Sequence, residues 1–198
     1  MAILEAVLGS IESDAPVKEA RSNLAWFGVW SRYCGLASTL ASAEYLESGG
    51  MSRGGESLAG HSARELAGLS LSDDPLEAAL GIAALNSLLD VNESRCEETN
   101  ARDLLLRRAA GRNLVLVGHF PFVPELREVA RQLSVLELRP HPGDLPAAEA
   151  SRLIPEADVL AITGTAFVNH TIEPLLSYRS RDATVILLGP TAPLSPVL

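Results

Sequence analysis

The residues best suited to chemistry follow short apolar runs in the second half of the chain. His119 follows the run Asn113–Val117, separated from it by Gly118. Histidine side chains as a class change charge near neutral pH and are common metal ligands, so a histidine at this place suits acid–base catalysis or metal binding. His141 and His170 follow later apolar runs and are weaker candidate metal ligands. The alternative for His119 is a histidine that hydrogen-bonds backbone groups in a packed loop.

Small and polar residues accompany these histidines, and we expect them to bind a ligand. Glu137 could act as a base, accept from a ligand hydroxyl, or pair with Arg139, and the sequence does not choose among these. Asn169 could either face a ligand or hydrogen-bond its own turn. The expected ligand-binding set in this half is Gly118, Phe120, Pro121, Glu137, Thr163, Gly164, Thr165, Asn169, Gly189, Pro190 and Thr191.

The common catalytic and cofactor motifs are missing from the sequence. There is no G-x-G-x-x-G dinucleotide fingerprint, no P-loop and no G-x-S-x-G elbow. No C-x-x-C or H-E-x-x-H spacing indicates a metal site. Cys34 is predicted to be a small buried hydrophobe, and Cys96 lies among acidic residues that disfavour its thiolate. Asp144 is interpreted as a helix cap.

The second half alternates apolar runs with helical spacing, which predicts a parallel sheet covered by helices on both faces. Ligands bind at the carboxyl ends of such strands, which is why the residues above are grouped. The expected strands are Asn113–Val117, Val135–Leu138, Asp158–Thr163 and Ala183–Leu188. The expected helices are Pro124–Leu133, Leu145–Ile154 with Asp144 as N-cap, and Thr171–Tyr178.

The first half of the chain combines helical patterns with two antiparallel strand patterns and does not alternate them as the second half does. This difference predicts a separate α+β domain. An Asp73-Asp74-Pro75 start precedes an unusually apolar helix. Gly49-Gly50 and Gly54-Gly55 indicate a flexible loop. We place the boundary near Gly111, giving domains 1–111 and 112–198. The expected helices are Met1–Gly9, Ser62–Gly68, Leu76–Leu89 and Asn100–Ala110, and the expected antiparallel strands are Val17–Val29 and Tyr33–Leu40.

Length and charge limit the functional classes. The chain has 198 residues and a formal net charge of −9, which disfavours a nucleic-acid partner because the phosphate backbone is bound by basic residues. The start of the chain lacks the basic region of a signal peptide, and no run approaches the roughly 20 apolar residues that span a bilayer. Two cysteines provide no disulfide framework. We expect a cytoplasmic protein with no membrane partner.

Several short strings in a fixed order resemble the putative heavy-metal chelation family of uncharacterised prokaryotic proteins. They are GLAST at 35–39, ALGIAALN at 79–86, VGHFP at 117–121, TGT at 163–165 with NHT at 169–171, and LGPT at 188–191. The resemblance implies an enolase N-terminal-like first domain and a Rossmann-like second domain, with a site where they meet. It adds Thr39 and Asn86 to the candidate ligand-binding residues. The alternative for Asn86 is an amide that ties down a loop.

Three functions remain open from the sequence. The first is binding of a metal ion, metal complex or small metabolite in a crevice between the domains, with a divalent or heavy metal as the expected cofactor. The second is an enzyme that acts on a metabolite or nucleotide-like cosubstrate with His119 as general acid or base. The third is a non-catalytic assembly module, such as a homodimer. Because the chain stops ten residues after Leu188, we also expect the second sheet to lack a final βα unit.

Overall fold

The structure, a computed structural model, describes residues 3–40 and 58–198. The chain divides into two compact units. One contains residues 1–92, 164–171 and 189–198 and is called the antiparallel unit. The other contains residues 93–163 and 172–188 and is called the parallel unit. The glycine pairs that predicted a flexible loop lie outside the described residues.

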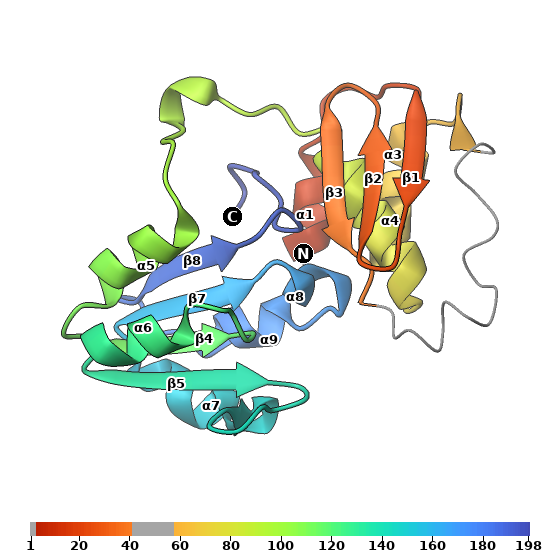
Figure 1. Cartoon of the computed structure of the whole chain (residues 1–198). Helices are drawn as coiled ribbons and strands as arrows, with labels where there is room; N and C mark the ends of the chain where they lie inside the picture. The colour runs from red at the N-terminus through yellow and green to blue at the C-terminus, as the bar shows by residue number, and fades with distance from the viewer. Residues whose placement is uncertain (1–2, 41–57) are drawn as a thin grey trace. The chain divides into compact units, whose positions relative to one another are not determined.

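The antiparallel unit is built on a three-stranded sheet in the order β1-β2-β3, drawn in orange in Figure 1. Helix α4 packs against β2 and β3 and also contacts α3 and the following 3-10 turn η2. The strands are β1 Glu19–Ser22, β2 Trp26–Trp30 and β3 Cys34–Ser38, and the helical segments are α1 Ile3–Gly9, α3 Ala63–Ala67, η2 Gly68–Leu71, α4 Pro75–Asn86 and α8 Thr165–Val168.

Two expectations for this unit are wrong. The predicted strand 17–29 is two strands, because Asn23 forms a turn in which its Oδ1 accepts from the backbone N–H groups of Ala25 and Trp26, both at 2.9 Å. Cys34 lies in a strand as predicted but is exposed. The alternation of side chains along β3 turns Gly35 and Ala37 inward and Cys34 outward.

Helix α4 follows its sequence signals closely. Asp74 is the N-cap and accepts from Leu76 N at 2.8 Å and Glu77 N at 3.2 Å, with Pro75 in the first turn. Most of the helix is buried, so its apolar residues surround it rather than forming one stripe. The apolar surface of α4 is shielded from water by the elements that pack around it, which include β2, β3 and α3.

The parallel unit has a five-stranded sheet in the order β6-β5-β4-β7-β8, with every neighbouring pair parallel. The chain starts at the central strand, moves outward to β6, then returns to the other side of β4. This is the sequence of the first five strands of the doubly wound order 3-2-1-4-5-6. The strands are β4 Asn113–Val117, β5 Gln132–Glu137, β6 Leu145–Pro146, β7 Val159–Thr163 and β8 Thr184–Leu188.

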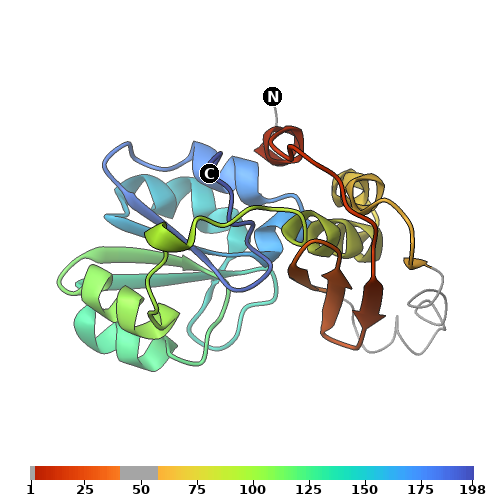
Figure 2. The same ribbon diagram turned by 90° about the horizontal axis from the view of Figure 1, so that it is seen from above.

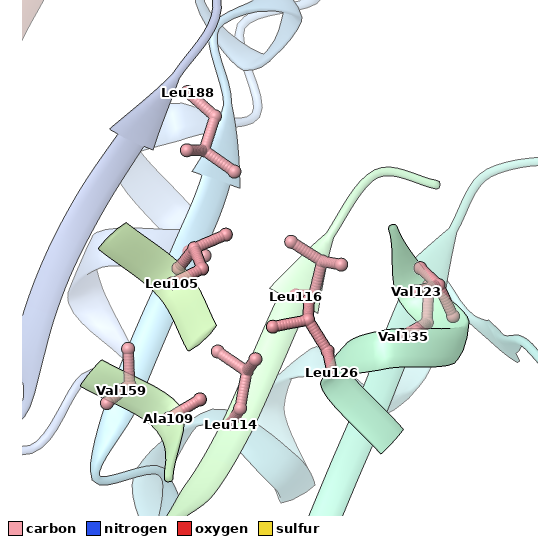
Figure 3. Close-up of a cluster of buried hydrophobic side chains, with 10 residues drawn as sticks. Leu105, Ala109, Leu114, Leu116, Val123, Leu126, Val135, Val159 and Leu188 are labelled. Atoms are coloured by element: carbon pink, nitrogen blue, oxygen red, sulfur yellow. The ribbon is translucent and has the colours of Figure 1, made fainter. Parts of the chain in front are cut away.

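Helices cover both faces of the parallel sheet. In Figure 2 the green helices α5 and α6 lie on one side of it, and α7 and α9 lie on the other. Leu105 and Ala109 of α5 and Leu126 of α6 meet β4 and its neighbours in a buried cluster (Figure 3). The helical segments are η3 Glu93–Arg95, α5 Ala101–Ala109, α6 Val123–Val129, η4 Ala147–Glu149, α7 Ala150–Leu153, η5 Ile154–Glu156 and α9 Ile172–Ser177.

The segment after β5 corrects another expectation. Instead of a helix over 145–154, the chain makes the two-residue edge strand β6 and then three short helical pieces, η4, α7 and η5. Asp144 is therefore not a helix cap. Helix α5 belongs to the core of the parallel unit although it precedes Gly111. The division into domains 1–111 and 112–198 stays a prediction.

Candidate functional site

The site is built on the carboxyl ends of β4 and β5, adjacent strands of the parallel sheet. Gly118 ends β4 with a φ of +103°, a conformation that side chains with a Cβ rarely adopt. Its N–H donates to Leu136 O at 2.9 Å, which keeps the turn against β5. An added Cβ would lie 3.1 Å from Thr163 Cβ, so the glycine also leaves room for the end of β7. The next residue, His119, then lies at the sheet edge.

Glu137, at the end of β5, holds the backbone of this edge. Its Oε1 accepts from His119 N at 2.7 Å and its Oε2 accepts from Leu138 N at 3.0 Å. Both carboxylate oxygens are therefore used within the loop. The structure shows this side chain in contact with the backbone, and the roles that the sequence left open for Glu137 stay predictions.

A tight turn brings a second histidine to the same edge. Asp144 N donates to His141 O at 2.9 Å, and Gly143 has a φ of +92°. Proline followed by such a glycine is typical of a type II turn. Arg127 of α6 also donates to Gly143 O at 3.1 Å. The turn places the His141 ring beside the His119 ring, with centroids 4.7 Å apart and planes at 51°.

Asp144 is a residue of this candidate site that the sequence did not point to. Its Oδ2 lies 2.8 Å from His119 Nδ1 and accepts from His141 N at 3.1 Å. The Asp144 side chain is 1% exposed, whereas that of His119 is 34% exposed. The Pro142-Gly143 turn signal was present in the sequence, but the contact with His119 joins residues that are 25 positions apart.

Burial and hydrogen bonding act against each other on Asp144. Burial, the largest influence, raises the pKa of Asp144. The hydrogen bonds from His119 and from the His141 backbone, with the charges of both imidazoles, lower it and prevail, so the pKa lies below its ordinary value. The carboxylate is therefore ionised near neutral pH and can only accept hydrogen bonds. In the hydrogen bond with His119, an ionised Asp144 accepts and the ring nitrogen Nδ1 donates.

The remaining predicted residues are divided between the units. Phe120 is half-buried and packs against the core cluster, stacked on Phe122 with centroids 5.3 Å apart. Pro121 is exposed. Thr163 ends β7 in the parallel unit. The other predicted residues belong to the antiparallel unit, and they are Thr39, Asn86, Gly164, Thr165, Asn169, His170, Gly189, Pro190 and Thr191.

Within the antiparallel unit, Asn86 and Thr191 form a small hydrogen-bonded group. Asn86 Nδ2 donates to the carbonyl oxygens of Leu36 at 3.1 Å, Thr191 at 3.3 Å and Pro190 at 3.4 Å. Thr191 Oγ1 accepts from Ser38 N at 3.0 Å. These contacts match the alternative in which Asn86 ties down a loop. They bring Asn86, Pro190 and Thr191 together.

Other predicted residues of this unit make hydrogen bonds or packing contacts within it. Thr39 is buried and donates from Oγ1 to Leu24 O at 2.9 Å. Asn169 Oδ1 accepts from Thr171 Oγ1 at 2.7 Å and from Thr171 N at 3.2 Å, as in its turn-forming alternative. Gly164 is buried against the backbone of Ala192. Thr165 begins helix α8, Gly189 is an exposed turn residue, and His170 is exposed.

The donor set at the sheet edge can be tested against a metal. Within residues 3–40 and 58–198, no group of three or more His, Cys, Asp or Glu side chains is arranged to hold a metal ion. His119 and His141 are the two side chains of metal-ligating type whose rings lie side by side at this edge.

Comparison with known proteins places the chain in a family. A family model described as putative heavy-metal chelation, DUF364, matches residues 100–198, and a second with the same description, DUF4213, matches residues 4–89. The chain belongs to the DUF364 family. The resemblance noted in the sequence is thereby confirmed, as is the order of a small α+β part followed by a parallel sheet.

Individual relatives agree with this assignment. A DUF364 protein of unknown function from Desulfitobacterium hafniense DCB-2, known from a crystal structure, is 28% identical with a TM-score of 0.79, covering 98% of this chain and 79% of that one. A DUF364 structure from Pyrococcus horikoshii, 19% identical, shows the same fold with a TM-score of 0.75 over 98% of this chain and 80% of that one.

A curated relative covers less of the chain. An uncharacterized protein of Methanocaldococcus jannaschii is 31% identical over 131 residues, which is 63% of this chain. The match is 51% of that relative's length, so the chain spans about half of it. Across the part of the chain that the structure describes, no helix combines the length and apolar character needed to cross a membrane.

Proposed function

We propose that the chain binds a transition-metal complex through His119 and His141 at the carboxyl edge of the parallel sheet. The observation that carries this proposal is the pair of imidazole rings 4.7 Å apart, one of them hydrogen-bonded through Nδ1 to a buried aspartate. The heavy-metal description of the DUF364 family supports it. The rest of the metal's coordination is supplied by the bound chelate.

The ligand types favour a particular class of metal. Imidazole nitrogen suits zinc, copper, nickel and iron, whereas magnesium and calcium prefer oxygen ligands. The nearest carboxylates already have protein partners, since Glu137 accepts from backbone N–H groups and Asp144 Oδ2 accepts from His119 and His141. We therefore expect a late transition metal that arrives with oxygen or nitrogen ligands of its own.

Nickel nitrilotriacetate tests this proposal, because it leaves a neighbouring pair of nickel positions open to imidazole. We expect the untagged protein to bind it, and His119→Ala and His141→Ala each to weaken binding about 10-fold or more. His61→Ala is the matched control, since His61 is an exposed histidine elsewhere in the chain. Failure of the unaltered protein to bind, or an equal loss in His61→Ala, would contradict the proposal.

A second function is favoured by the hydrogen bond between Asp144 and His119. A histidine oriented by a buried carboxylate can take a proton at its other nitrogen, as a general base does. The two functions respond differently to a strong chelator. Turnover of a small metabolite that persists in the chelator and disappears in His119→Ala would favour the enzyme over the metal-complex binder.

A further inference from the structure

A buried carboxylate, that of Asp144, lies beside the histidine pair. We propose that Asp144 is a positioning residue that holds His119 in a single tautomer, with the proton on Nδ1, and keeps His141 beside it. This inference rests on the proposed function for its purpose. The tautomer itself is a property of the protein alone.

The contacts of Asp144 are arranged for both tasks. A single oxygen, Oδ2, reaches His119 Nδ1 at 2.8 Å and the His141 backbone N–H at 3.1 Å. One side chain therefore fixes the rotation of one imidazole and the turn that carries the other. Carboxylates that hydrogen-bond the remote nitrogen of a metal-binding histidine orient the ring and increase its basicity.

The burial of the Asp144 side chain supports a role for it in the site. Its side chain is 1% exposed, and its second oxygen, Oδ1, is buried without a hydrogen-bond partner among the described residues. A buried polar oxygen without a partner costs free energy compared with an apolar group that packs equally well. Unpaired buried groups of this kind call for an explanation such as a role in a site. Orientation of His119 provides one.

The surrounding charges do not substitute for Asp144. Glu137 approaches His119 only at the backbone N–H, so it does not orient the ring. Arg127 donates to Gly143 O and holds the turn from the side of α6. The carboxylate that hydrogen-bonds the His119 ring is that of Asp144.

Nitrogen NMR of the metal-free protein tests the tautomer directly. With histidines labelled with nitrogen-15, we expect the neutral His119 ring to show the proton on Nδ1 in the unaltered protein, and a mixture of tautomers in Asp144→Ala. Asp182→Ala is the control, because Asp182 is an exposed aspartate of the same unit. A proton on Nε2, or a mixture, in the unaltered protein would overturn the proposal even if Asp144→Ala failed to fold.

Binding of nickel nitrilotriacetate provides the second measurement. We expect Asp144→Ala to weaken it about 10- to 100-fold, while the exposed control variant leaves it unchanged. Unchanged binding in a folded Asp144→Ala would contradict the positioning role. If the unaltered protein shows the Nδ1 tautomer but binds no nickel complex, the proposed function fails and the positioning of His119 stands.

Discussion

At the scale of single residues, the candidate site contains titratable side chains that differ in what they contact. Their residue types alone do not show which of them hydrogen-bond within the protein. Glu137, Asp144 and His119 are all titratable residues near one edge of the sheet. In the proposed function, His119 is the one of these three that binds the ligand. Glu137 accepts from the backbone, and Asp144 accepts from His119 and His141. Reading residue types alone made Glu137 a candidate ligand and Asp144 a helix cap.

Gly118 is the residue on which the position of His119 depends most. Its φ of +103° and the 3.1 Å approach of an added Cβ to Thr163 predict that Gly118→Ala lowers the free energy of unfolding by about 1–3 kcal/mol. Urea unfolding followed by circular dichroism measures the loss. Gly9→Ala is the control, since nothing lies within 4 Å of a Cβ added to that residue at the end of α1. Equal stability of the two variants would contradict this account.

At the scale of elements, helix starts were the most predictable features. Asp74, Asn100 and Ser62 each cap a helix by accepting from backbone N–H groups in its first turn. Helix ends and short pieces were less predictable, because tertiary contacts decide them. The segment 145–156 pairs briefly with β5 and then turns through η4, α7 and η5, whereas its sequence indicated one helix.

The start of α3 carries a pH dependence. Asp14 accepts from Arg64 N at 2.9 Å and from Ala15 N at 2.7 Å. A hydrogen bond with the Ser62 side chain is the main influence that lowers the pKa of Asp14, while slight desolvation opposes it. A carboxyl whose pKa is lower in the folded state stabilises the protein above its ordinary pKa and loses that effect as the pH falls through its folded value.

Asp14→Asn should therefore destabilise the protein more at pH 7 than in acid. Because Asp14 is exposed, we expect a loss of up to about 1 kcal/mol at neutral pH after allowing for solvent screening. The difference between variant and unaltered protein should shrink as the pH falls below about 4. Denaturant unfolding at both pH values measures it, and a difference independent of pH would show that the charge of Asp14 contributes nothing.

At the scale of the whole molecule, each compact unit depends on a buried set drawn from several distant segments. In the parallel unit, α5, β4, α6, β5, β7 and β8 all contribute side chains to one cluster (Figure 3). The net charge of the 198-residue sequence is −9, which disfavours binding to the phosphate backbone of nucleic acid. The absence of a nucleic-acid partner remains a prediction. A homodimer also remains a prediction.

The cluster predicts how sensitive the parallel unit is to loss of packing. Leu116 of β4 is fully buried at its centre, so Leu116→Ala should cost about 2–5 kcal/mol through lost burial and the cavity left behind. Leu138→Ala is the control, because Leu138 is 67% exposed and should change stability by less than about 0.5 kcal/mol. Thermal unfolding of both variants tests this, and similar losses would contradict the assignment of the core.

The sequence by itself determined the features that depend on neighbouring residues. Apolar runs identified the strands β4, β7 and β8 almost to the residue, and an Asp-Pro start identified α4. Family membership also followed from ordered strings that the family models match. These signals are local because hydrophobic period and capping act within a few residues.

Only the tertiary structure decided which side chains share a site. The contact of His119 with Asp144 and the approach of its ring to that of His141 join three loop residues through the pairing of β4 with β5. The tertiary structure also decided that Glu137 accepts from the His119 backbone N–H and that Asn86 donates to the Leu36 carbonyl oxygen. Such contacts depend on strand order and register, and hydrophobic periodicity within one strand carries no information about which strand lies beside it.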